Sequence, residues 1–113
     1  MDVKTVEMLI EPGAEKLLVD MGRRMKTRAR SKVIERAVRH IRDDMHISDV
    51  MAWFSEDRFA PARRTTVRLS AESADYLSAL ADTLGKGRPA VLLDLVYFAA
   101  TQISEDDQRS LSA

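Results

Sequence analysis

Polar and apolar side chains alternate in two short stretches of this chain, one near its start and one past its middle. In residues 64–69 the two sides of an extended backbone carry Thr65, Val67 and Leu69 against Arg64, Thr66 and Arg68. In residues 5–10 they carry Val6, Met8 and Ile10 against Thr5, Glu7 and Leu9. A period of two residues is typical of a strand with one buried face, so the pattern predicts two short strands.

Two helical segments follow the later strand. Apolar residues recur there at steps of three and four, which is the spacing of an amphipathic helix. Ser70 is expected to cap the first helix at its start, and Gly85 to end it. Pro89 suits the first turn of a second helix, which is apolar nearly all round over 90–103.

The early strand is followed by the same succession of segments. Pro12 and Gly13 mark the turn into one helix, residues 26–30 form a basic loop, and Ser31 is expected to cap the next helix. The apolar positions recur 59 residues later in the first helix and 58 residues later in the second. Examples are Leu18, Met21 and Met25 against Leu77, Leu80 and Leu84, and Val33, Ile34 and Val38 against Val91, Leu92 and Val96. The sequence therefore predicts a duplicated strand–helix–helix unit.

Neither unit is large enough to fold alone, because a short strand needs a ladder partner and about 45 residues bury too small a core. We therefore expect a mostly α-helical protein. Its two short antiparallel strands would pair with each other, beside four main helices and a partly helical connector. The predicted organisation is a first repeat over 1–45, a connector over 46–62, a second repeat over 63–103 and an acidic tail over 104–113, with both repeats folding as one unit.

Composition narrows the classes of protein that fit. The chain of 113 residues carries 18 basic and 18 acidic side chains, so overall charge alone does not attract nucleic acid. Cysteine is absent, which excludes disulfides and thiolate metal sites. No apolar run approaches the ~20 residues that span a bilayer, and we expect a cytoplasmic protein that has no membrane partner.

Charge is nevertheless distributed unevenly along the chain. Nine basic residues and one acid, Glu35, lie between positions 23 and 42. Four arginines and no acid lie between positions 58 and 68, after a stretch that is acidic. These two basic blocks favour a surface that faces an anion.

The later unit combines the strand, the helices and the basic residues in one run. Residues 64–70 read RTTVRLS, and they are followed by Leu77, Leu80-Ala81, Leu84-Gly85, Gly87-Arg88 and AVLL at 90–93. This run resembles the ribbon–helix–helix DNA-binding family of MetJ/Arc type, and the tandem form is similar to TraY-like conjugation accessory proteins. The resemblance implies a single-chain pseudo-dimer whose paired ribbon enters the major groove of double-stranded DNA. The free chain would be a monomer whose copies associate on DNA.

The resemblance also implies roles for two sets of residues. Strand residues that would read base edges are Arg64, Thr66 and Arg68 in the later strand and Thr5, Glu7 and Leu9 in the earlier one. Residues at helix starts and nearby that would contact phosphates are Arg28, Arg30, Ser31 and Lys32, and Lys86, Gly87, Arg88 and Ala90. Because Arg binds guanine edges well and Glu7 repels phosphate, we expect the later strand to dominate the readout.

The predicted function is sequence-specific DNA binding, as a transcriptional repressor or as a DNA-transfer (relaxosome-type) accessory protein. The two histidines, His40 and His46, match no zinc motif, and no catalytic or cofactor-binding pattern occurs, so we expect neither an enzyme nor a cofactor. Two alternatives stay open. One is a protein–protein interaction module with a silent ribbon, which would hold its partner through Trp53 and Phe54 of the connector. The other is an antitoxin.

Overall fold

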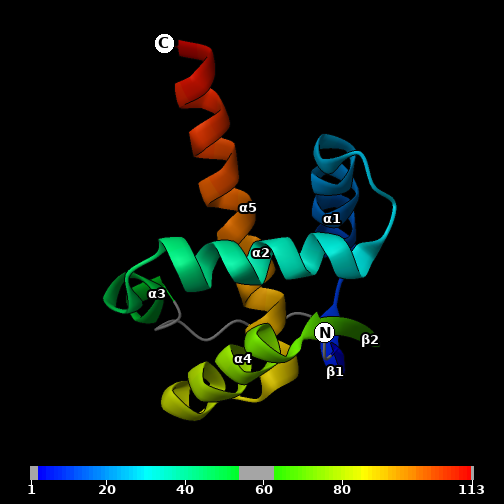
Figure 1. Ribbon diagram of the computed structural model, residues 1–113, viewed down its shortest axis with the longest axis vertical. Helices are drawn as coiled ribbons and strands as arrows, with labels where there is room; N and C mark the ends of the chain where they lie inside the picture. The colour runs from blue at the N-terminus through cyan, green and yellow to red at the C-terminus, as the bar shows by residue number, and fades with distance from the viewer. Residues whose placement is uncertain (1–2, 54–62, 113) are drawn as a thin grey trace.

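The computed structural model describes residues 3–53 and 63–112, with side chains described for 3–50 and 63–101. The elements in order are β1 (Val3–Ile10), α1 (Pro12–Met25), α2 (Arg30–Asp44), α3 (Ile47–Trp53), β2 (Arg63–Ser70), α4 (Ala71–Leu84) and α5 (Arg88–Ser112). The described part of the chain is therefore mostly helical, with five helices and one two-stranded antiparallel sheet (Figure 1). This confirms the prediction of a mostly α-helical protein with two short antiparallel strands, and it confirms the order of elements.

The sheet pairs β1 with β2 along the whole of both strands. Val3 lies opposite Ser70 at one end, Ile10 lies opposite Arg63 at the other, and Glu7 lies opposite Thr66 near the middle. The inward side chains that are buried are Met8, Ile10, Val67 and Leu69. The outward ones are Thr5, Glu7, Leu9, Arg64, Thr66 and Arg68, all exposed except the half-buried Leu9. The predicted alternation of faces is confirmed in both strands.

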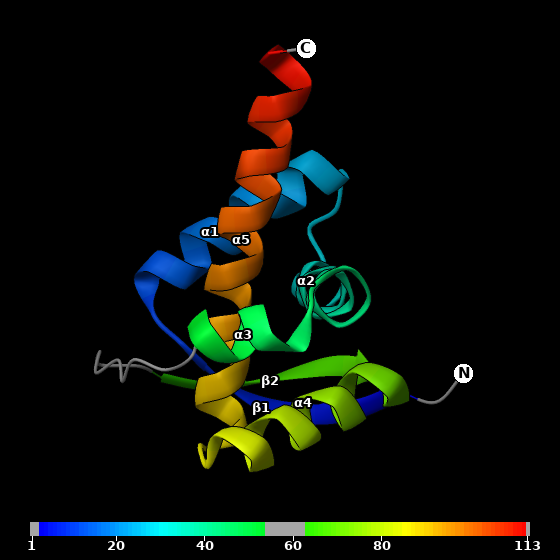
Figure 2. The same ribbon diagram turned by 90° about the vertical axis from the view of Figure 1, so that its left-hand side faces the viewer.

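The long helices connect the two halves of the chain. Helix α5, from the later half of the chain, contacts β1, whereas α2, from the earlier half, contacts β2. Figure 2 shows α5 crossing the sheet and rising past α1, with α2 seen nearly end-on. The helices α2 and α5 also pack on each other, and each contributes fully buried residues to the core, among them Ile34, Val38, Leu92 and Val96. One hydrophobic core therefore contains residues from both halves.

Helix ends follow the sequence signals in the second half of the chain and depart from them in the first. Ser70 caps α4, since its Oγ accepts a hydrogen bond from the Ser73 N–H at 3.2 Å. The expected cap at Ser31 is wrong, because α2 begins at Arg30 and its N-cap position is Ala29. The reason is that Ser31 Oγ is engaged elsewhere, accepting from the backbone N–H of Arg68 in β2 at 3.0 Å.

The last helix is longer than the sequence predicts, and the connector contains a short helix. The last helix, α5, continues to Ser112, past the end expected near Ile103. The connector is partly helical, as predicted, since it contains α3. The side chain of Trp53 and the whole of Phe54 lie outside the described residues. Within the described part, none of the helices is both long and apolar enough to cross a lipid bilayer.

The end of α1 is a strained counterpart of the end of α4. Lys26 follows α1 in the left-handed conformation, with φ 58° and ψ 42°. Gly85, which lies 59 positions later, follows α4 with φ 67° and ψ 30°. Glycine adopts this conformation without the clash that a Cβ causes, whereas other residues pay about 1–2 kcal/mol for it. The first unit therefore carries local strain that the second unit avoids.

Replacing Lys26 by glycine should relieve this strain. We expect Lys26→Gly to raise the free energy of unfolding by about 1 kcal/mol in urea titrations followed by circular dichroism. Lys16→Gly, in the exposed interior of α1, is the matched control and should lower the same free energy by about 1 kcal/mol. Equal losses in both variants would contradict this view of the helix end.

Candidate nucleic-acid interface

The outer face of the sheet brings together all six side chains that were predicted to read bases. Across the two strands, Thr5 lies opposite Arg68, Glu7 opposite Thr66, and Leu9 opposite Arg64. Since side chains directly opposite in an antiparallel pair lie within about 5.5 Å at Cβ, the six form one continuous surface. Polar and charged groups dominate it, and Leu9 is its only aliphatic member.

The cations on this face differ in how they are paired. A guanidinium nitrogen of Arg64 lies 3.1 Å from a carboxylate oxygen of Glu7, which sits diagonally across the sheet. Both side chains are more than half exposed, at 70% and 57%, and such pairs stabilise a protein by less than about 1 kcal/mol, so another acceptor can replace Glu7. The guanidinium of Arg68 has no ion pair within the described residues. It is the readily available cation of the face.

Each edge of the sheet is flanked by the start of a helix. A hollow of about 250 Å³ lies between Thr5 and Glu7 of β1 and Arg88 at the start of α5. A second hollow, of about 180 Å³, lies between Arg64 of β2 and Arg30 at the start of α2. The first N–H groups of a helix have no acceptor within it, and the helix dipole favours an anion there. Both edges therefore combine a helix start with an arginine.

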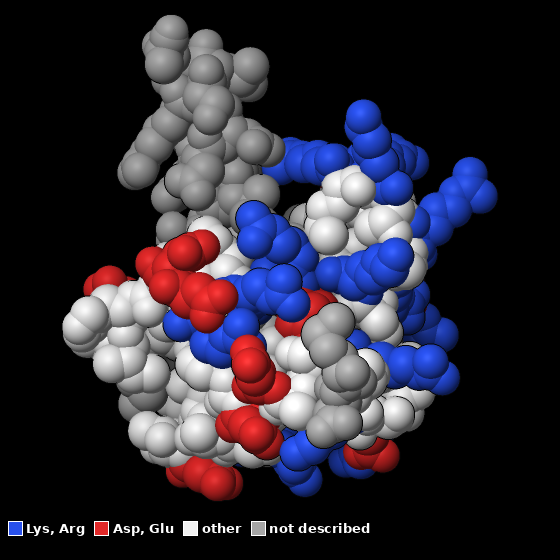
Figure 3. Space-filling view, viewed as in Figure 1, with Lys and Arg blue, Asp and Glu red and all other residues white. Residues whose placement is uncertain are grey.

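The residues predicted to contact phosphates are only partly brought together. Arg30 and Arg88 lie at the two hollows beside the sheet, whereas Arg28 lines a different hollow between α1 and α2. Lys32 and Gly87 are exposed, and Lys86 and Ala90 are half-buried. Figure 3 shows basic side chains gathered over α1, its connection to α2, and α2 itself. The exposed basic residues of that stretch are Arg23, Arg24, Lys26, Arg28, Arg30, Lys32, Arg36 and Arg39.

Ser31 and Glu35 hold α2 against the open edge of β2. Ser31 Oγ accepts from the N–H of Arg68, and Glu35 Oε1 accepts from the N–H of Ser70 at 2.6 Å. The other oxygen of Glu35 accepts from the hydroxyl of the buried Ser73 at 2.5 Å. Strand N–H groups that would otherwise face solvent are thus paired, and the start of α2 is fixed beside the outer face.

Sequence reasoning missed two charged residues at this interface. Glu35 was noted only as the single acid of a basic block, and that isolation was the available signal of a structural partner. Arg63 begins β2 on the inward side of the alternation, and its guanidinium lies 2.9 Å from the carboxylate of Glu15 in α1. That contact ties the end of the sheet to α1.

The protonation of Glu35 is linked to these contacts. Burial alone would raise the pKa of its carboxyl group, but hydrogen bonds from Ser73 and Ser70, together with the charge of Arg39, outweigh burial. The pKa of Glu35 therefore lies below its ordinary value. Within the described ranges, no group of three or more acidic or histidine side chains is placed to hold a metal ion.

A comparison of the chain with models of protein families, with curated proteins and with solved structures gives no match. The function therefore has to be inferred from the interface itself.

Glu35→Gln tests the attachment of α2 to the strand. A lowered pKa in the folded state means that the ionised carboxylate stabilises the protein above about pH 4.5, and that this stabilisation is lost as the pH falls through the folded-state value. We expect the variant to lose about 1–3 kcal/mol of unfolding free energy near pH 7, with the difference from the parent protein shrinking on acidification. Urea unfolding at a series of pH values measures both effects.

Glu72→Gln provides the matched control. Glu72 is 83% exposed and its contact with Arg42 is 3.6 Å long, so its replacement should change the unfolding free energy by less than about 0.5 kcal/mol. A difference between parent and Glu35→Gln that stays constant from neutral to acidic pH would show that the carboxylate charge is not what holds α2.

Proposed function

We propose that this chain is a sequence-specific double-stranded DNA-binding protein, built as a tandem ribbon–helix–helix pseudo-dimer and acting as a transcriptional repressor or a DNA-transfer accessory protein. One observation carries the proposal. The outer face of the paired strands presents Arg64 and Arg68, and a helix start with its own arginine flanks each edge of that face. This arrangement matches a groove that has acceptors on its floor and a phosphate backbone on either side.

The register of the sheet supports the pseudo-dimer. Glu7 and Thr66 occupy equivalent positions at the 59-residue offset, and they lie directly opposite each other. A two-fold axis between the two units would place equivalent residues opposite each other at the centre of the sheet. The crossed packing of α5 on β1 and of α2 on β2 agrees with this relation. The single chain then supplies both strands that two separate subunits would otherwise provide.

The dimensions and the chemistry agree with binding in the major groove. That groove is about 12 Å wide and admits a two-stranded ribbon, whose alternate side chains then point at base edges. Arg68 is free to bind guanine O6 and N7 with two hydrogen bonds. Arg64 would exchange its weak contact with Glu7 for a base or a phosphate. The two strands differ in charge, so we expect the two halves of the target site to differ in sequence.

The helix starts would position the ribbon without reading sequence. Phosphates beside Arg30 and Arg88 would accept hydrogen bonds from the backbone N–H groups at the helix starts. The guanidinium charges would attract the same phosphates. Pro89 removes one N–H donor from the start of α5. The site at α2 should therefore be the stronger of the two. Each such contact releases counterions, so affinity should fall steeply as salt concentration rises.

Selection of bound duplexes from a random pool tests this function directly. The parent protein should enrich a defined site, and Arg68→Ala should lose about 1–3 kcal/mol of discrimination between that site and random DNA. Lys16→Ala, which removes a cation from the exposed face of α1, should leave that discrimination unchanged. Failure to enrich any duplex at low salt would refute the proposal.

Glu7→Gln separates charge repulsion from base reading. Removing the carboxylate frees Arg64 and reduces repulsion of phosphates, so affinity for random duplex should stay equal or increase. Fluorescence anisotropy with a labelled random duplex over a series of salt concentrations measures the change. A loss of affinity as large as that of Arg68→Ala would mean that both strands contribute alike.

A further inference from the structure

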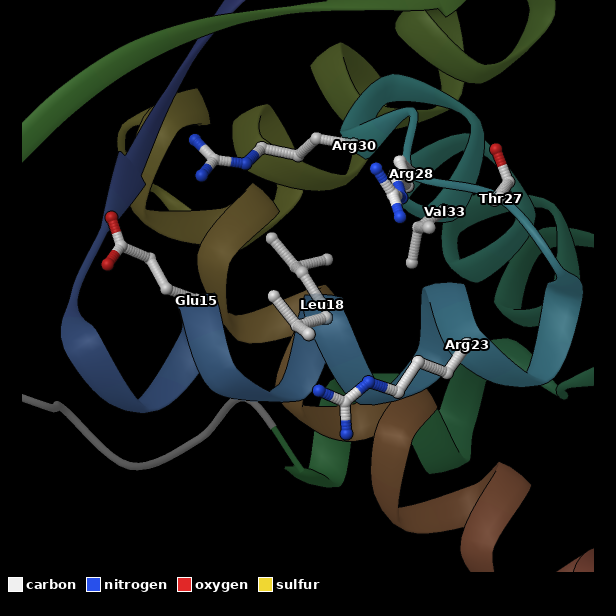
Figure 4. Close-up of a pocket in the computed structure, with 8 residues that line it drawn as sticks. Glu15, Leu18, Arg23, Thr27, Arg28, Arg30 and Val33 are labelled. Carbon is white, nitrogen blue, oxygen red and sulfur yellow. The ribbon is translucent and has the colours of Figure 1, made fainter.

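A hollow lined by apolar and basic side chains lies away from the outer face of the sheet, between α1 and α2. Its volume is about 450 Å³, which falls within the range of small-molecule sites, roughly 300–1,000 Å³. Figure 4 looks into it, with Leu18 of α1 and Val33 of α2 pointing inward and three arginines around them. Of the residues that line this hollow, the function proposed above uses Arg30, from the side that faces β2.

The floor of the hollow is apolar. Leu18 and Val33 belong to the hydrophobic core, where they are 4% and 2% exposed. Val19 lies beside them and is 55% exposed, one of the few large aliphatic side chains of the described chain that face solvent. The exposed aliphatic surface of Val19 beside this buried apolar floor favours a ligand with an apolar body.

The rim of the hollow is strongly cationic. Arg23, Arg28 and Arg30 line it, and within the described residues their guanidinium groups have no ion-pair or hydrogen-bond partner. The one acid on the rim, Glu15, is already paired with Arg63 at 2.9 Å. Three guanidinium groups without a counter-charge around one hollow attract an anion, which arginine can bind through two hydrogen bonds at once.

The equivalent place in the second unit lacks these features. Val19 and Arg23 correspond to Ser78 and Asp82 at the 59-residue offset. Arg30 corresponds to Arg88, whose guanidinium lies 3.4 Å from the hydroxyl of Ser78. The exposed aliphatic side chain of Val19 and the unpaired cation of Arg23 are therefore particular to the first unit, although both units share the same backbone plan. General packing needs do not explain this difference.

We propose that the hollow between α1 and α2 binds a small amphiphilic organic anion, with an apolar body on Val19 and Leu18 and a carboxylate or phosphate head group held by the arginines. Arg30 and Glu15 line this hollow and also the smaller one beside β2. A bound anion would therefore compete with a DNA phosphate for Arg30. On the basis of the proposed function, the ligand would act as an effector that weakens DNA binding.

Calorimetric titration of the full chain with decanoate tests the site without DNA. Decanoate should bind with saturation at one molecule per chain, whereas decanol and acetate, which lack the charge and the apolar body respectively, should bind at least about tenfold more weakly. Titration with decyl phosphate then identifies the preferred head group. Absence of saturable binding by both anions, or equal binding of decanol, would overturn the proposal.

The double variant V19S/R23D gives the first unit the residues that the second unit has at these two positions. It should weaken decanoate binding at least about tenfold. Both positions are exposed, and circular dichroism checks that the fold is kept. Lys16→Asp makes the same change of charge on α1 outside the hollow and should leave decanoate binding unchanged. Equal binding by the parent protein and V19S/R23D would show that decanoate binds elsewhere.

The link to DNA is measured separately. Decanoate should lower the affinity of the parent protein for its selected duplex and should have much less effect on V19S/R23D. If the chain binds no duplex, the proposed function fails while calorimetry still reports on the site. If decanoate binds at the hollow but leaves duplex affinity unchanged, competition for Arg30 is refuted.

Discussion

Within the described part of the chain, β1 and β2 have no ladder partner other than each other, and their register fixes which side chains share a face. A shift of β2 by one residue would turn Arg64 and Arg68 toward the core and move Val67 and Leu69 into solvent. The burial of those apolar side chains therefore specifies the register. The exposure of Arg64 and Arg68 on the outer face therefore follows from the burial of the apolar side chains on the inner face.

Contacts between the two halves of the chain then hold helices against both strands of this sheet. On one side, Ser31 and Glu35 of α2 accept from strand N–H groups of β2. On the other side, α5 packs across β1, and its Tyr97 hydroxyl donates to the carboxylate of Glu11 just before α1. The paired N–H groups at the edge of β2 disfavour pairing with another strand there, and the outer face stays exposed. A face of alternating side chains suits a groove, and the same edge contacts set the helix starts beside it.

Local patterns in the sequence were sufficient for the strands, the order of helices, the Ser70 cap and the outward set of side chains, because each follows from periodicity or backbone conformation. Features made by contacts between distant segments were not. Ser31 looked like a cap but serves the edge of β2, and Glu35 looked like one charge among many. The hollow between α1 and α2 depends on the relative orientation of the two helices, which cannot be predicted from the periodicity of the sequence. Lys26 gave no sign of its left-handed conformation, which glycine signals at the equivalent position.

Nuclear magnetic resonance of the ¹⁵N-labelled chain, titrated with a selected duplex, tests the central claim most directly. If the paired strands enter the major groove, the largest shifts will fall on the amides of both strands, on the side-chain nitrogens of Arg64 and Arg68, and on the first residues of α2 and α5. Shifts confined to the basic residues of α1 and its connection to α2, with the strands unchanged, would contradict the account.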